Sequence, residues 1–482
     1  MELKVVPASR AAKNRYELVV IGSGFGSSFF LVEALKRIQG RILVIEWGGY
    51  QSWDWQVKRG VNARMNHRDT FTNKTEKYWN FTVGFGGGTN CWFAQTPRLH
   101  PSDFSTKSLY GVADDWPVSY ADLEPYYAEA EAIMAVSGDP DMAAMFPRST
   151  AYPQPPHRPT AIDRIMKQKQ PERHFVMPTA RARVATDTRP ACCSNARCNL
   201  CPIQAKFTAL NGFEKVYTDP RVHVCLDSEV RSLDARGGVV NKAVFRQEGK
   251  DYRVAGDLFV LGANAIQSPA ILLRSGMDSG NAGQGLHEQV GVNVEVFLEG
   301  LDNFDGSTIT TGLNYSLYDG AFRKDHASCL IYFENRWSHG LRKEPGRWRE
   351  TLPLVIVAED IPAGHNRVTI QEDTGQATVT YQGESDYARR GIEVALEKLP
   401  GILEPLPVEA IHFRGNRSTE AHLQGTLKMG DSPDHSVVDA GQLHHQYRNL
   451  AVVGTPVFPS CACANPSLTA AALSLRAARR ML

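Results

Sequence analysis

The sequence predicts an α/β chain with two kinds of β-sheet, one parallel and one antiparallel, each accompanied by helices. Three observations support this fold class. An apolar run at Leu18–Ile21 leads through glycines into a helical pattern and a second apolar run at 42–46. The segment 257–276 repeats the order of strand, small-residue turn and helix. Between 305 and 382, by contrast, strand patterns follow one another directly, which is typical of an antiparallel sheet.

Composition and charge limit the classes of protein to which this chain can belong. The chain has 482 residues and a mass of 53.3 kDa, enough for about two or three domains. Hydrophobic residues make up 42% and charged residues 22%, as in a soluble globular protein. The 53 Lys and Arg residues balance the 52 Asp and Glu residues, so we expect no nucleic-acid partner. We also expect no transmembrane segment, and no secretory signal is visible, which makes the cytoplasm the default location.

The elements predicted along the chain begin with a β-α-β unit, which implies parallel strands and a right-handed crossover. Its parts are the strand Leu18–Ile21, a helix from Phe29 to Ile38 and the strand at 42–46. Residues 366–371 and 377–382 predict two strands joined by a hairpin turn at 372–376. The other predictions are a helix at 119–136 capped by Ser119 or Asp122, a Pro-rich loop at 152–159, strands at 308–318, 328–337 and 352–361, a helix at 386–399, a strand and turn at 449–460, and a helix at Leu468–Met481.

A glycine-rich turn after the first strand predicts a dinucleotide site. Gly22 permits a tight turn, Gly24 lets the backbone approach a pyrophosphate, and the helix after Gly26 offers free N–H groups to the anion. The third glycine of the usual G-x-G-x-x-G motif is replaced by Ser27, which is small enough for close packing. Glu46 ends the second strand, where an acidic residue can bind ribose hydroxyls. The turn alone does not decide between NAD and FAD.

Five further segments resemble glucose–methanol–choline (GMC) oxidoreductases, and they occur in that family's order. They are residues 84–104, 115–131, 261–276, 422–430 and 465–482. Within the family, the SLYG…DWP run and an adjacent-cysteine cluster are similar to the flavin subunits of bacterial FAD-dependent glucose and gluconate dehydrogenases. The resemblance implies a Rossmann-like FAD-binding domain with a parallel sheet, a substrate domain with an antiparallel sheet and helices, and oxidation of a CH–OH group.

The resemblance also divides the chain into alternating segments. We expect the FAD-binding domain to be formed by 1–110, by 186–300 with the cysteine cluster, and by 426–482. We expect 111–185 to be a substrate-domain or connecting segment and 301–425 to be the substrate domain.

The family's catalytic pair falls on His422 and Asn465. An imidazole with its ordinary pKa near 6.5 can accept the proton of an alcohol near neutral pH. An amide does not titrate and can donate to the alkoxide oxygen. His412, His444 and His445 lack such a context, and we interpret them as surface or structural residues.

The expected cofactor is FAD bound without a covalent link. Cys91 occupies the place where related enzymes carry a tethering histidine. The second glycine loop, residues 84–91, is expected to lie along the isoalloxazine ring. The cofactor contacts expected on this resemblance and on the first turn are Gly22, Gly24, Phe25, Gly26, Glu46, Gly86, Gly87, Thr89, Asn90, Val230, Gly262, Thr455 and Thr469.

Four cysteines lie within ten residues, at 192–201, and indicate metal or redox chemistry. The resemblance implies that Cys192, Cys193 and Cys198 hold a three-iron (3Fe-4S) cluster, whereas the spacing leaves the role of Cys201 open. A zinc site or an empty loop are the alternatives. A cluster would send electrons to a small partner subunit or a cytochrome, and similar flavin subunits reach the periplasm bound to a signal-bearing partner.

Two functions therefore stand side by side. The first is a dehydrogenase of sugars or other polar alcohols with FAD and an iron–sulfur cluster. The second is an FAD oxidase of the pyranose oxidase type, which reduces O2 to hydrogen peroxide and uses its cysteines structurally. The substrate itself is not specified, although Asn314, Tyr332, Asn335 and Trp337 are of the types that line sugar sites.

Overall fold

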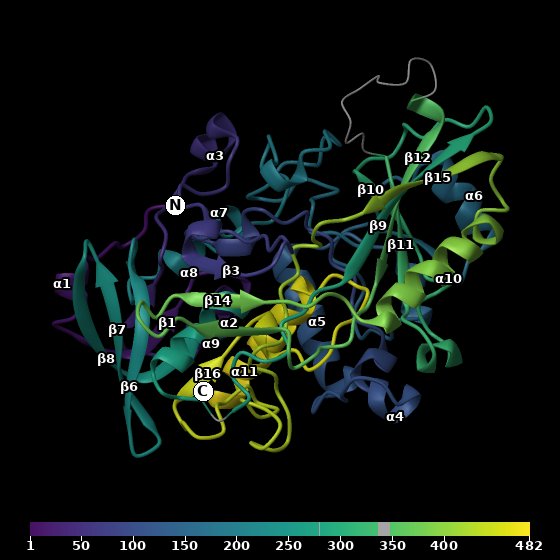
Figure 1. Cartoon of the computed structure of the whole chain (residues 1–482). Helices are drawn as coiled ribbons and strands as arrows, with labels where there is room; N and C mark the ends of the chain where they lie inside the picture. Colours follow the sequence, from purple (N-terminus) through teal and green to yellow (C-terminus); the bar gives the residue numbers. More distant parts are fainter. Residues whose placement is uncertain (279, 336–347) are drawn as a thin grey trace.

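Two main β-sheets stand at opposite ends of the molecule, with helices packed beside each (Figure 1). The computed structural model describes residues 1–278, 280–335 and 348–482. One sheet is mostly parallel and the other antiparallel, which confirms the predicted fold class.

The first sheet is built around the predicted β-α-β unit. Its strand order is β5-β2-β1-β8-β7-β6, and β16 pairs with β8 as a seventh strand. The central strands are buried along most of their length, as expected of parallel strands covered on both faces. An antiparallel extension, β7 and β6, was not predicted. The strands are β1 (Arg15–Ile21), β2 (Ile42–Ile45), β5 (Val222–Cys225), β6 (Glu229–Arg236), β7 (Val239–Gln247), β8 (Lys250–Leu261) and β16 (Leu450–Val452).

The first helix of this unit begins earlier than the sequence predicts. Helix α2 spans Phe25–Ala34, with Gly24 as its N-cap, instead of 29–38. A Cβ on Gly22 would lie 2.6 Å from the carbonyl oxygen of Gly262, and Gly22 has a φ of +90°. Only glycine therefore permits the chain to turn directly from β1 into α2 beside the strand β8.

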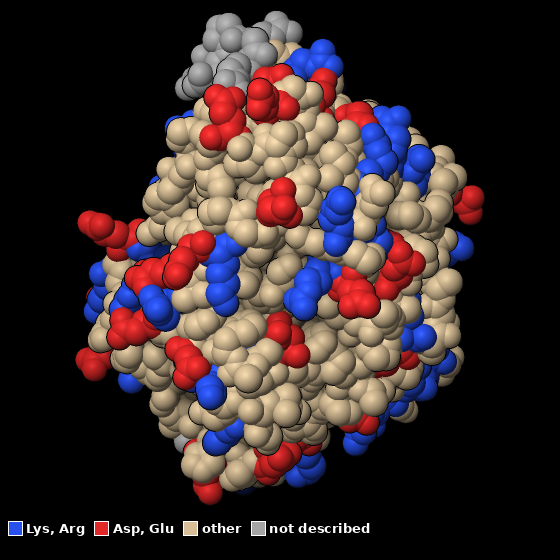
Figure 2. Space-filling model, turned by 90° about the vertical axis from the view of Figure 1, so that its right-hand side faces the viewer, with Lys and Arg blue, Asp and Glu red and all other residues tan. Residues whose placement is uncertain are grey.

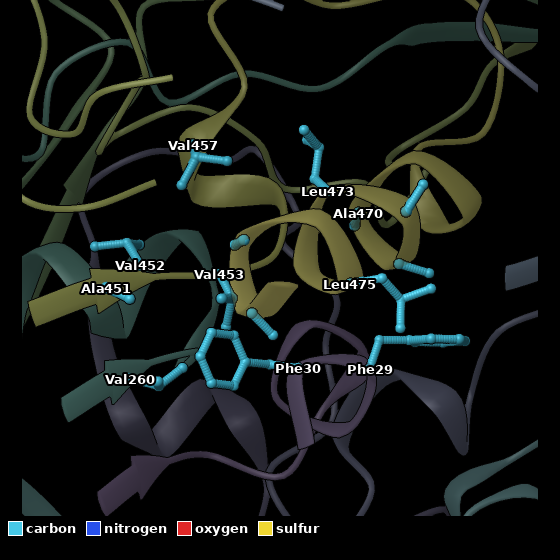
Figure 3. Packing of buried hydrophobic residues seen from close by; sticks show 14 of the residues in the cluster. Phe29, Phe30, Val260, Ala451, Val452, Val453, Val457, Ala470, Leu473 and Leu475 are labelled. Atoms are coloured by element: carbon cyan, nitrogen blue, oxygen red, sulfur yellow. The ribbon is translucent and has the colours of Figure 1, made fainter. Parts of the chain in front are cut away.

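The core of this half is formed by α2 and the C-terminal helix α11 (Ser467–Met481). Phe29 and Phe30 of α2 pack with Leu473 and Leu475 of α11 beside Val453 at the end of β16 (Figure 3). Helix α5 (Tyr120–Met134) packs on α11, and of the two predicted caps Ser119 is the N-cap, while Asp122 lies in the first turn and completes the capping box.

The second sheet has the order β15-β9-β12-β11-β10-β4 and is antiparallel throughout. Helix α10 (Asp386–Ile402) packs against it, and the apolar side chains between them form a separate core cluster. Strand β9 lies within 186–300 and β4 within 111–185, so both segments contribute to this sheet, and the residue limits of the domains stay a prediction. The strands are β4 (His174–Val176), β9 (Val290–Leu298), β10 (Thr310–Asn314), β11 (Cys329–Glu334), β12 (Thr351–Ala358) and β15 (Val408–Asn416).

The predicted hairpin at 366–382 exists but does not join the second sheet. Its strands β13 (Arg367–Ile370) and β14 (Ala377–Thr380) form a three-stranded sheet with β3 (Phe71–Asn73), which runs parallel to β14. The strands predicted over 305–382 are therefore antiparallel to their neighbours from that segment, as expected, but they are divided between two sheets. Val368, Val379 and Phe71 gain burial against Ile266 of helix α9 (Asn264–Arg274) instead.

The remaining helices are short connections around these layers. They are α1 (Ala8–Ala11), α3 (Trp53–Arg59), α4 (Thr106–Tyr110), α6 (Ala161–Lys169), α7 (Ala209–Gly212) and α8 (Glu214–Tyr217). Within the described ranges, every helix is too short or too polar to cross a membrane. Figure 2 shows the end of the molecule that carries the second sheet, where acidic and basic side chains are interspersed.

Candidate active site

A cavity of about 510 Å³ runs from the first glycine turn to the central strands β11 and β12 of the second sheet. One part of its wall is the turn between β1 and α2, together with Glu46 at the end of β2. The other part includes Tyr332 of β11, Val355 and Val357 of β12, and the segment Arg417–Leu423. His422 and Asn465 line the same cavity, so the structure brings the predicted dinucleotide turn and the predicted catalytic pair together.

The first glycine turn is held in shape by Glu46. One carboxylate oxygen of Glu46 accepts hydrogen bonds from the backbone N–H of Ser23 at 3.0 Å and from its hydroxyl at 2.7 Å. The other accepts from the backbone N–H of Gly48 at 3.0 Å. Burial raises the pKa of Glu46 despite these bonds. A Cβ on Gly26 would lie 2.6 Å from the nitrogen of Gly454, so glycine is needed where α2 crosses this segment.

The second glycine loop is tied to the first by a hydrogen bond from the N–H of Gly86 to the hydroxyl of Ser23, at 2.9 Å. Gly87 lines the cavity, as does Cys91. Thr89 and Asn90 have a different role, because their side chains bond within the loop, to the carbonyl oxygens of Gly86 and Phe85 at 2.8 and 2.7 Å. These two side chains thus hold the loop in shape, while other residues of the loop line the cavity.

The other expected cofactor residues divide in the same way. Phe25, Val230, Gly262 and Thr455 line the cavity. Thr469 does not, since its buried hydroxyl is paired with the hydroxyl of Tyr127 at 2.7 Å in the contact between α11 and α5.

His422 and Asn465 are in direct contact with each other in the cavity wall. Nε2 of His422 lies 3.3 Å from Nδ2 of Asn465. The Asn465 amide is oriented by two partners, because the Tyr332 hydroxyl donates to its Oδ1 at 3.0 Å and its Nδ2 donates to Oε1 of Gln95 at 3.1 Å. Gln95 was not among the predicted residues, although it lies in the matching segment 84–104. Tyr332, one of the residues of a type that lines sugar sites, is part of the cavity wall.

The electrostatics of His422 differ from the expectation. Burial, followed by the positive charge of Arg417, lowers the pKa of His422 to about 3, where the sequence alone suggested about 6.5. The imidazole is therefore neutral over the whole physiological range, which is the form that accepts a proton. Burial raises the pKa of the neighbouring Glu420 to about 7, while its ion pair with Arg417 opposes that shift.

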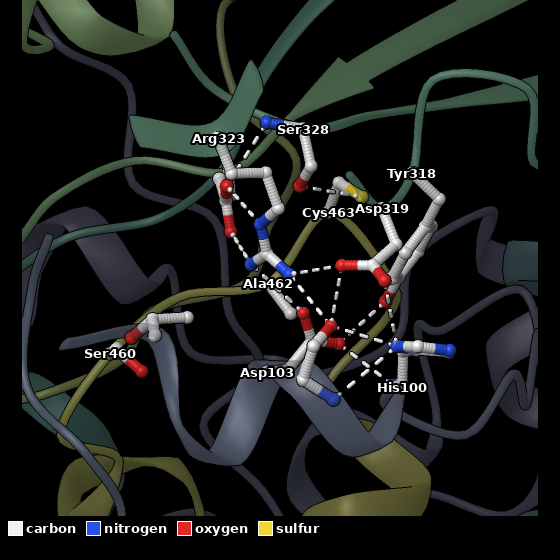
Figure 4. A network of polar contacts seen from close by, with 12 residues as sticks. His100, Asp103, Tyr318, Asp319, Arg323, Ser328, Ser460, Ala462 and Cys463 are labelled. Carbon is white, nitrogen blue, oxygen red and sulfur yellow. Dashed lines mark hydrogen bonds and ion pairs between the residues drawn. The ribbon is translucent and has the colours of Figure 1, made fainter. Parts of the chain in front are cut away.

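The turn before Asn465 is fixed by a buried ionic network (Figure 4). The fully buried guanidinium of Arg323 pairs with Glu359 at 2.6 Å and with Asp103 at 3.0 Å. Ser328 donates its N–H to Glu359 at 3.0 Å and its hydroxyl to the sulfur of Cys463 at 3.4 Å. This network joins the second sheet to the segment that carries Asn465, so it helps to hold the two halves of the site in register.

The cysteine loop, residues 192–201, does not form a preassembled metal site with other described residues. Cys198 is buried, Cys192 is half-buried and Cys193 is exposed. No group of three or more Cys, His, Asp or Glu side chains gathered as metal ligands occurs in the part of the chain that the structure describes. The buried guanidinium of Arg181 donates to the sulfur of Cys198 at 3.5 Å, and its Nε and Nη2 have no hydrogen-bond partner among the described residues.

Two side chains connect the cysteine loop to the second glycine loop. The buried ammonium of Lys206 donates to the carbonyl oxygens of Asn90 at 2.8 Å, Trp92 at 3.0 Å and Asn199 at 3.1 Å. Asn62 donates to the carbonyl oxygens of Asn90 and Asn199 at 2.8 and 3.0 Å. The cysteine loop is therefore joined through these hydrogen bonds to the second glycine loop, which lines the cavity.

The remaining candidates lie away from the cavity. Asn314 is buried and bonded to Gln170, and Asn335 follows β11 outside the cavity wall, whereas Trp337 lies outside the described residues. His412 is exposed on β15, and His444 is buried against Tyr447, which fits the surface and structural roles expected of them. His445 bonds the Ser436 hydroxyl at 2.8 Å.

Comparisons with known proteins agree with this geometry. A family model described as GMC oxidoreductase matches residues 393–474, which include His422 and Asn465. The fructose dehydrogenase large subunit of Gluconobacter japonicus is 28% identical over 83% of this chain and 80% of its own length. The 6'''-hydroxyparomomycin C oxidase of Streptomyces lividus is 29% identical over 96% of this chain and 91% of its own.

Among solved structures, pyridoxine 4-oxidase from Mesorbium loti has the same fold, with a TM-score of 0.70 and 17% identity over 96% of this chain and 98% of that one. The matching C-terminal region contains the two residues that face each other in the cavity, and the likeness to the curated relatives extends over nearly the whole chain. The C-terminal region of the chain is thus similar to GMC oxidoreductases, and nearly the whole chain is similar to curated dehydrogenases and oxidases of alcohols and sugars.

Proposed function

We propose that this enzyme uses FAD to oxidise a CH–OH group of a sugar, a glycoside or a related polar alcohol, with His422 as the base. The observation that carries the proposal is the pairing of a neutral imidazole with an oriented amide at a cavity that continues into a glycine turn. The name of the similar fructose dehydrogenase large subunit points to a polar, hydroxylated substrate.

The residues of the first turn fit a dinucleotide. A Cβ on Gly24 would meet no atom within 4 Å, so the chain leaves open space where α2 begins. The N–H groups at the start of α2 would hold the pyrophosphate, and Glu46 would hold the ribose hydroxyls. Because Cys91 stands where a tethering histidine would be, we expect acid precipitation to leave FAD in the supernatant. A pellet that stays yellow would contradict non-covalent binding.

The proton chemistry follows from the chain's own side chains. Bound FAD supplies the hydride acceptor. The substrate hydroxyl would donate to Nε2 of His422, while the Asn465 amide donates one N–H to the same oxygen and steadies its developing negative charge. Tyr332 and Gln95 keep the amide turned so that its NH2 group faces the imidazole. The protein thereby positions the hydroxyl between a proton acceptor and a hydrogen-bond donor.

We further propose that Cys192, Cys193 and Cys198 hold an iron–sulfur cluster, which would pass electrons singly to a protein acceptor. The support is chemical, since three thiols share one loop and the buried, incompletely partnered guanidinium of Arg181 adjoins Cys198. Arg181 has no carboxylate partner in the described part of the chain, and a buried cation of this kind favours an anionic group nearby. The acceptor would be a small partner subunit or a cytochrome. For location we propose the cytoplasm, with export alongside a signal-bearing partner as the alternative that fractionation would distinguish.

The second candidate is an oxidase that passes electrons from flavin to O2, with structural cysteines. The name of the relative 6'''-hydroxyparomomycin C oxidase favours it. Iron and acid-labile sulfide in protein prepared without air, together with hydrogen peroxide formed per substrate in air, separate the two. Iron with little peroxide supports the dehydrogenase, whereas peroxide in equal amount to product without iron supports the oxidase.

The experiment for the proposal as a whole is anaerobic mixing of the purified flavoprotein with a panel of sugars, glycosides and polyols. We expect at least one to bleach the oxidised flavin absorbance in a single turnover. A panel in which only apolar alcohols bleach the flavin would contradict the proposed substrate class.

A further inference from the structure

We propose that Gln289 fixes the proton of His422 on Nδ1 and thereby leaves Nε2 as the proton acceptor. This inference rests on the proposed function, because it assigns a positioning role to a residue that supports the base of that reaction. Gln289 lies just before β9, is 2% exposed and touches the side of His422 that faces away from Asn465. A neutral imidazole carries one proton, and the tautomer decides which nitrogen can act as a base.

The direction of the Gln289 amide is set by two backbone carbonyls. Its Nε2 lies 2.9 Å from the carbonyl oxygen of Ala462 and 3.0 Å from that of Ala464. Carbonyl oxygens only accept hydrogen bonds, so the NH2 group must point toward them. A flipped amide would place its oxygen against both carbonyls and lose both bonds. The Oε1 atom therefore points the other way.

That oxygen lies 3.0 Å from Nδ1 of His422. An amide oxygen is an acceptor only, so this contact is a hydrogen bond only when Nδ1 carries the proton. Gln424 also directs its Nε2 toward the same oxygen, at 3.4 Å, which again requires an acceptor there. Two donors thus converge on Oε1, and one of them is the imidazole.

The opposite side of the ring agrees with this tautomer. With the Tyr332 hydroxyl donating to Oδ1 of Asn465, the Asn465 NH2 group faces Nε2 of His422. A donor at 3.3 Å from Nε2 is compatible with a lone pair and incompatible with a second N–H. Gln289 therefore selects the tautomer with the proton on Nδ1, and the contact with Asn465 is compatible with it.

The test compares Gln289→Met, Gln289→Glu and a glutamine control outside the cavity wall, Gln247→Met on β7, in the FAD-bound enzyme. Methionine keeps the length and bulk, but its thioether is only a weak acceptor for a hydrogen bond from the Nδ1–H of His422. Glutamate can accept that hydrogen bond, although it loses the bonds to Ala462 and Ala464. We expect Gln289→Met to slow single-turnover flavin reduction about 100-fold, with the substrate concentration for half-maximal rate changed less than threefold. Gln289→Glu should be at least about tenfold faster than Gln289→Met, and Gln247→Met should stay within about threefold of wild type.

A second measurement reports the tautomer directly. Protein with 15N-labelled histidine should show His422, assigned by its loss in His422→Ala, with the proton on Nδ1. In Gln289→Met we expect a mixture of the two tautomers. In Gln289→Glu the Nδ1 form should persist. The acid limb of flavin reduction that is due to protonation of His422 should move to higher pH in this variant, since a carboxylate stabilises the imidazolium. FAD content and melting temperature check that each variant is folded.

The outcomes separate this inference from the proposed function. If His422→Ala reduced flavin at the wild-type rate, the assignment of the base would fail. If His422→Ala were slow but Gln289→Met kept both the rate and the Nδ1 signal of wild type, the role of Gln289 would be overturned alone. Should Gln289→Met not fold, an unchanged pH profile in Gln289→Glu would overturn the role, and a shifted acid limb with the Nδ1 signal retained would support it.

Discussion

At the base of the cavity each polar side-chain atom of His422 and Asn465 has a partner. In the cysteine loop, by contrast, the buried Arg181 guanidinium is incompletely bonded among the described residues, and the four cysteines form no group of metal ligands there. The first arrangement is preorganised by the chain itself, so it needs only substrate and cofactor to act. The second carries thiols and a buried cation joined by one hydrogen bond, from Arg181 to Cys198. The difference teaches that substrate oxidation and electron exit can be tested as separate parts of the molecule.

Apart from the loss of His422, the largest expected effect on flavin reduction is that of losing the oriented Asn465 amide. Asn465→Ala removes the N–H that faces the substrate oxygen, and loss of one such donor slows catalysis by about 10²–10³. Stopped-flow flavin reduction measures this, with the exposed Asn241→Ala on β7 as a control that should behave as wild type. A rate within threefold of wild type in Asn465→Ala would remove the amide from the account.

Changes in the cysteine loop should impair electron transfer out of the flavin and leave flavin reduction by substrate intact. Cys193→Ser should lose iron and most electron transfer to a protein acceptor, while substrate still bleaches the flavin in one turnover, because that step uses His422 and Asn465. Ligand loss also loosens the loop, so iron content and both half-reactions are measured on one sample. Cys201→Ser is the matched control and should retain iron. Full cytochrome reduction by an iron-free Cys193→Ser would end the relay role.

The pH dependence sharpens the comparison within the cavity. Because the pKa of His422 is lowered to about 3, His422 should contribute no acid limb between pH 5 and 8. Glu420, with its pKa raised to about 7, takes up a proton as the pH falls through 7 and leaves the charge of Arg417 balanced only by the more indirect influence of Glu334 and Glu288. That charge disfavours the imidazolium, so kcat/KM should fall by about tenfold or less below pH 7. In Glu420→Gln the acid limb of kcat/KM near pH 7 should vanish. A limb that persists in this variant would show that it belongs to a group other than Glu420.

The smallest effect is expected at Thr469. Thr469→Val removes a buried hydrogen bond to Tyr127, worth about 1 kcal/mol of stability. The FAD dissociation constant should change less than threefold, since the hydroxyl does not face the cavity. Titration of the apoprotein with FAD, beside a thermal melt, measures both; a tenfold weaker affinity without a loss of stability would restore the cofactor contact.

How much the sequence predicts depends on whether the signal is local. The glycine turn, Glu46, His422 and Asn465 each belong to a contiguous motif, and they meet at one cavity as expected. Gln289 and Gln95 reach the same site from separate segments through tertiary packing, so no spacing along the chain announces Gln289. The pKa of His422 was misjudged for the same reason, because burial and the nearness of Arg417 exist only in the folded chain.

The fold shows a similar limit. The strand β1 and the capped helix α5 follow from short-range patterns of burial and capping. The pairing of β14 with β3 joins residues about 300 positions apart, and the hairpin pattern carries no information about its third strand. The start of α2 at Phe25 was missed because glycines and serines have weak helix propensity, whereas tertiary contacts with Gly454 fix that turn.

The most direct test of the central claim is the rate of anaerobic flavin reduction in His422→Ala, measured in a single turnover with a substrate that reduces the wild-type enzyme. FAD should remain bound, because His422 is not part of the glycine turn. We predict a rate about 10²–10⁴ lower than that of wild type, the usual consequence of losing a general base. A His422→Ala protein that binds FAD and reduces it within twofold of the wild-type rate would contradict the claim that His422 accepts the proton.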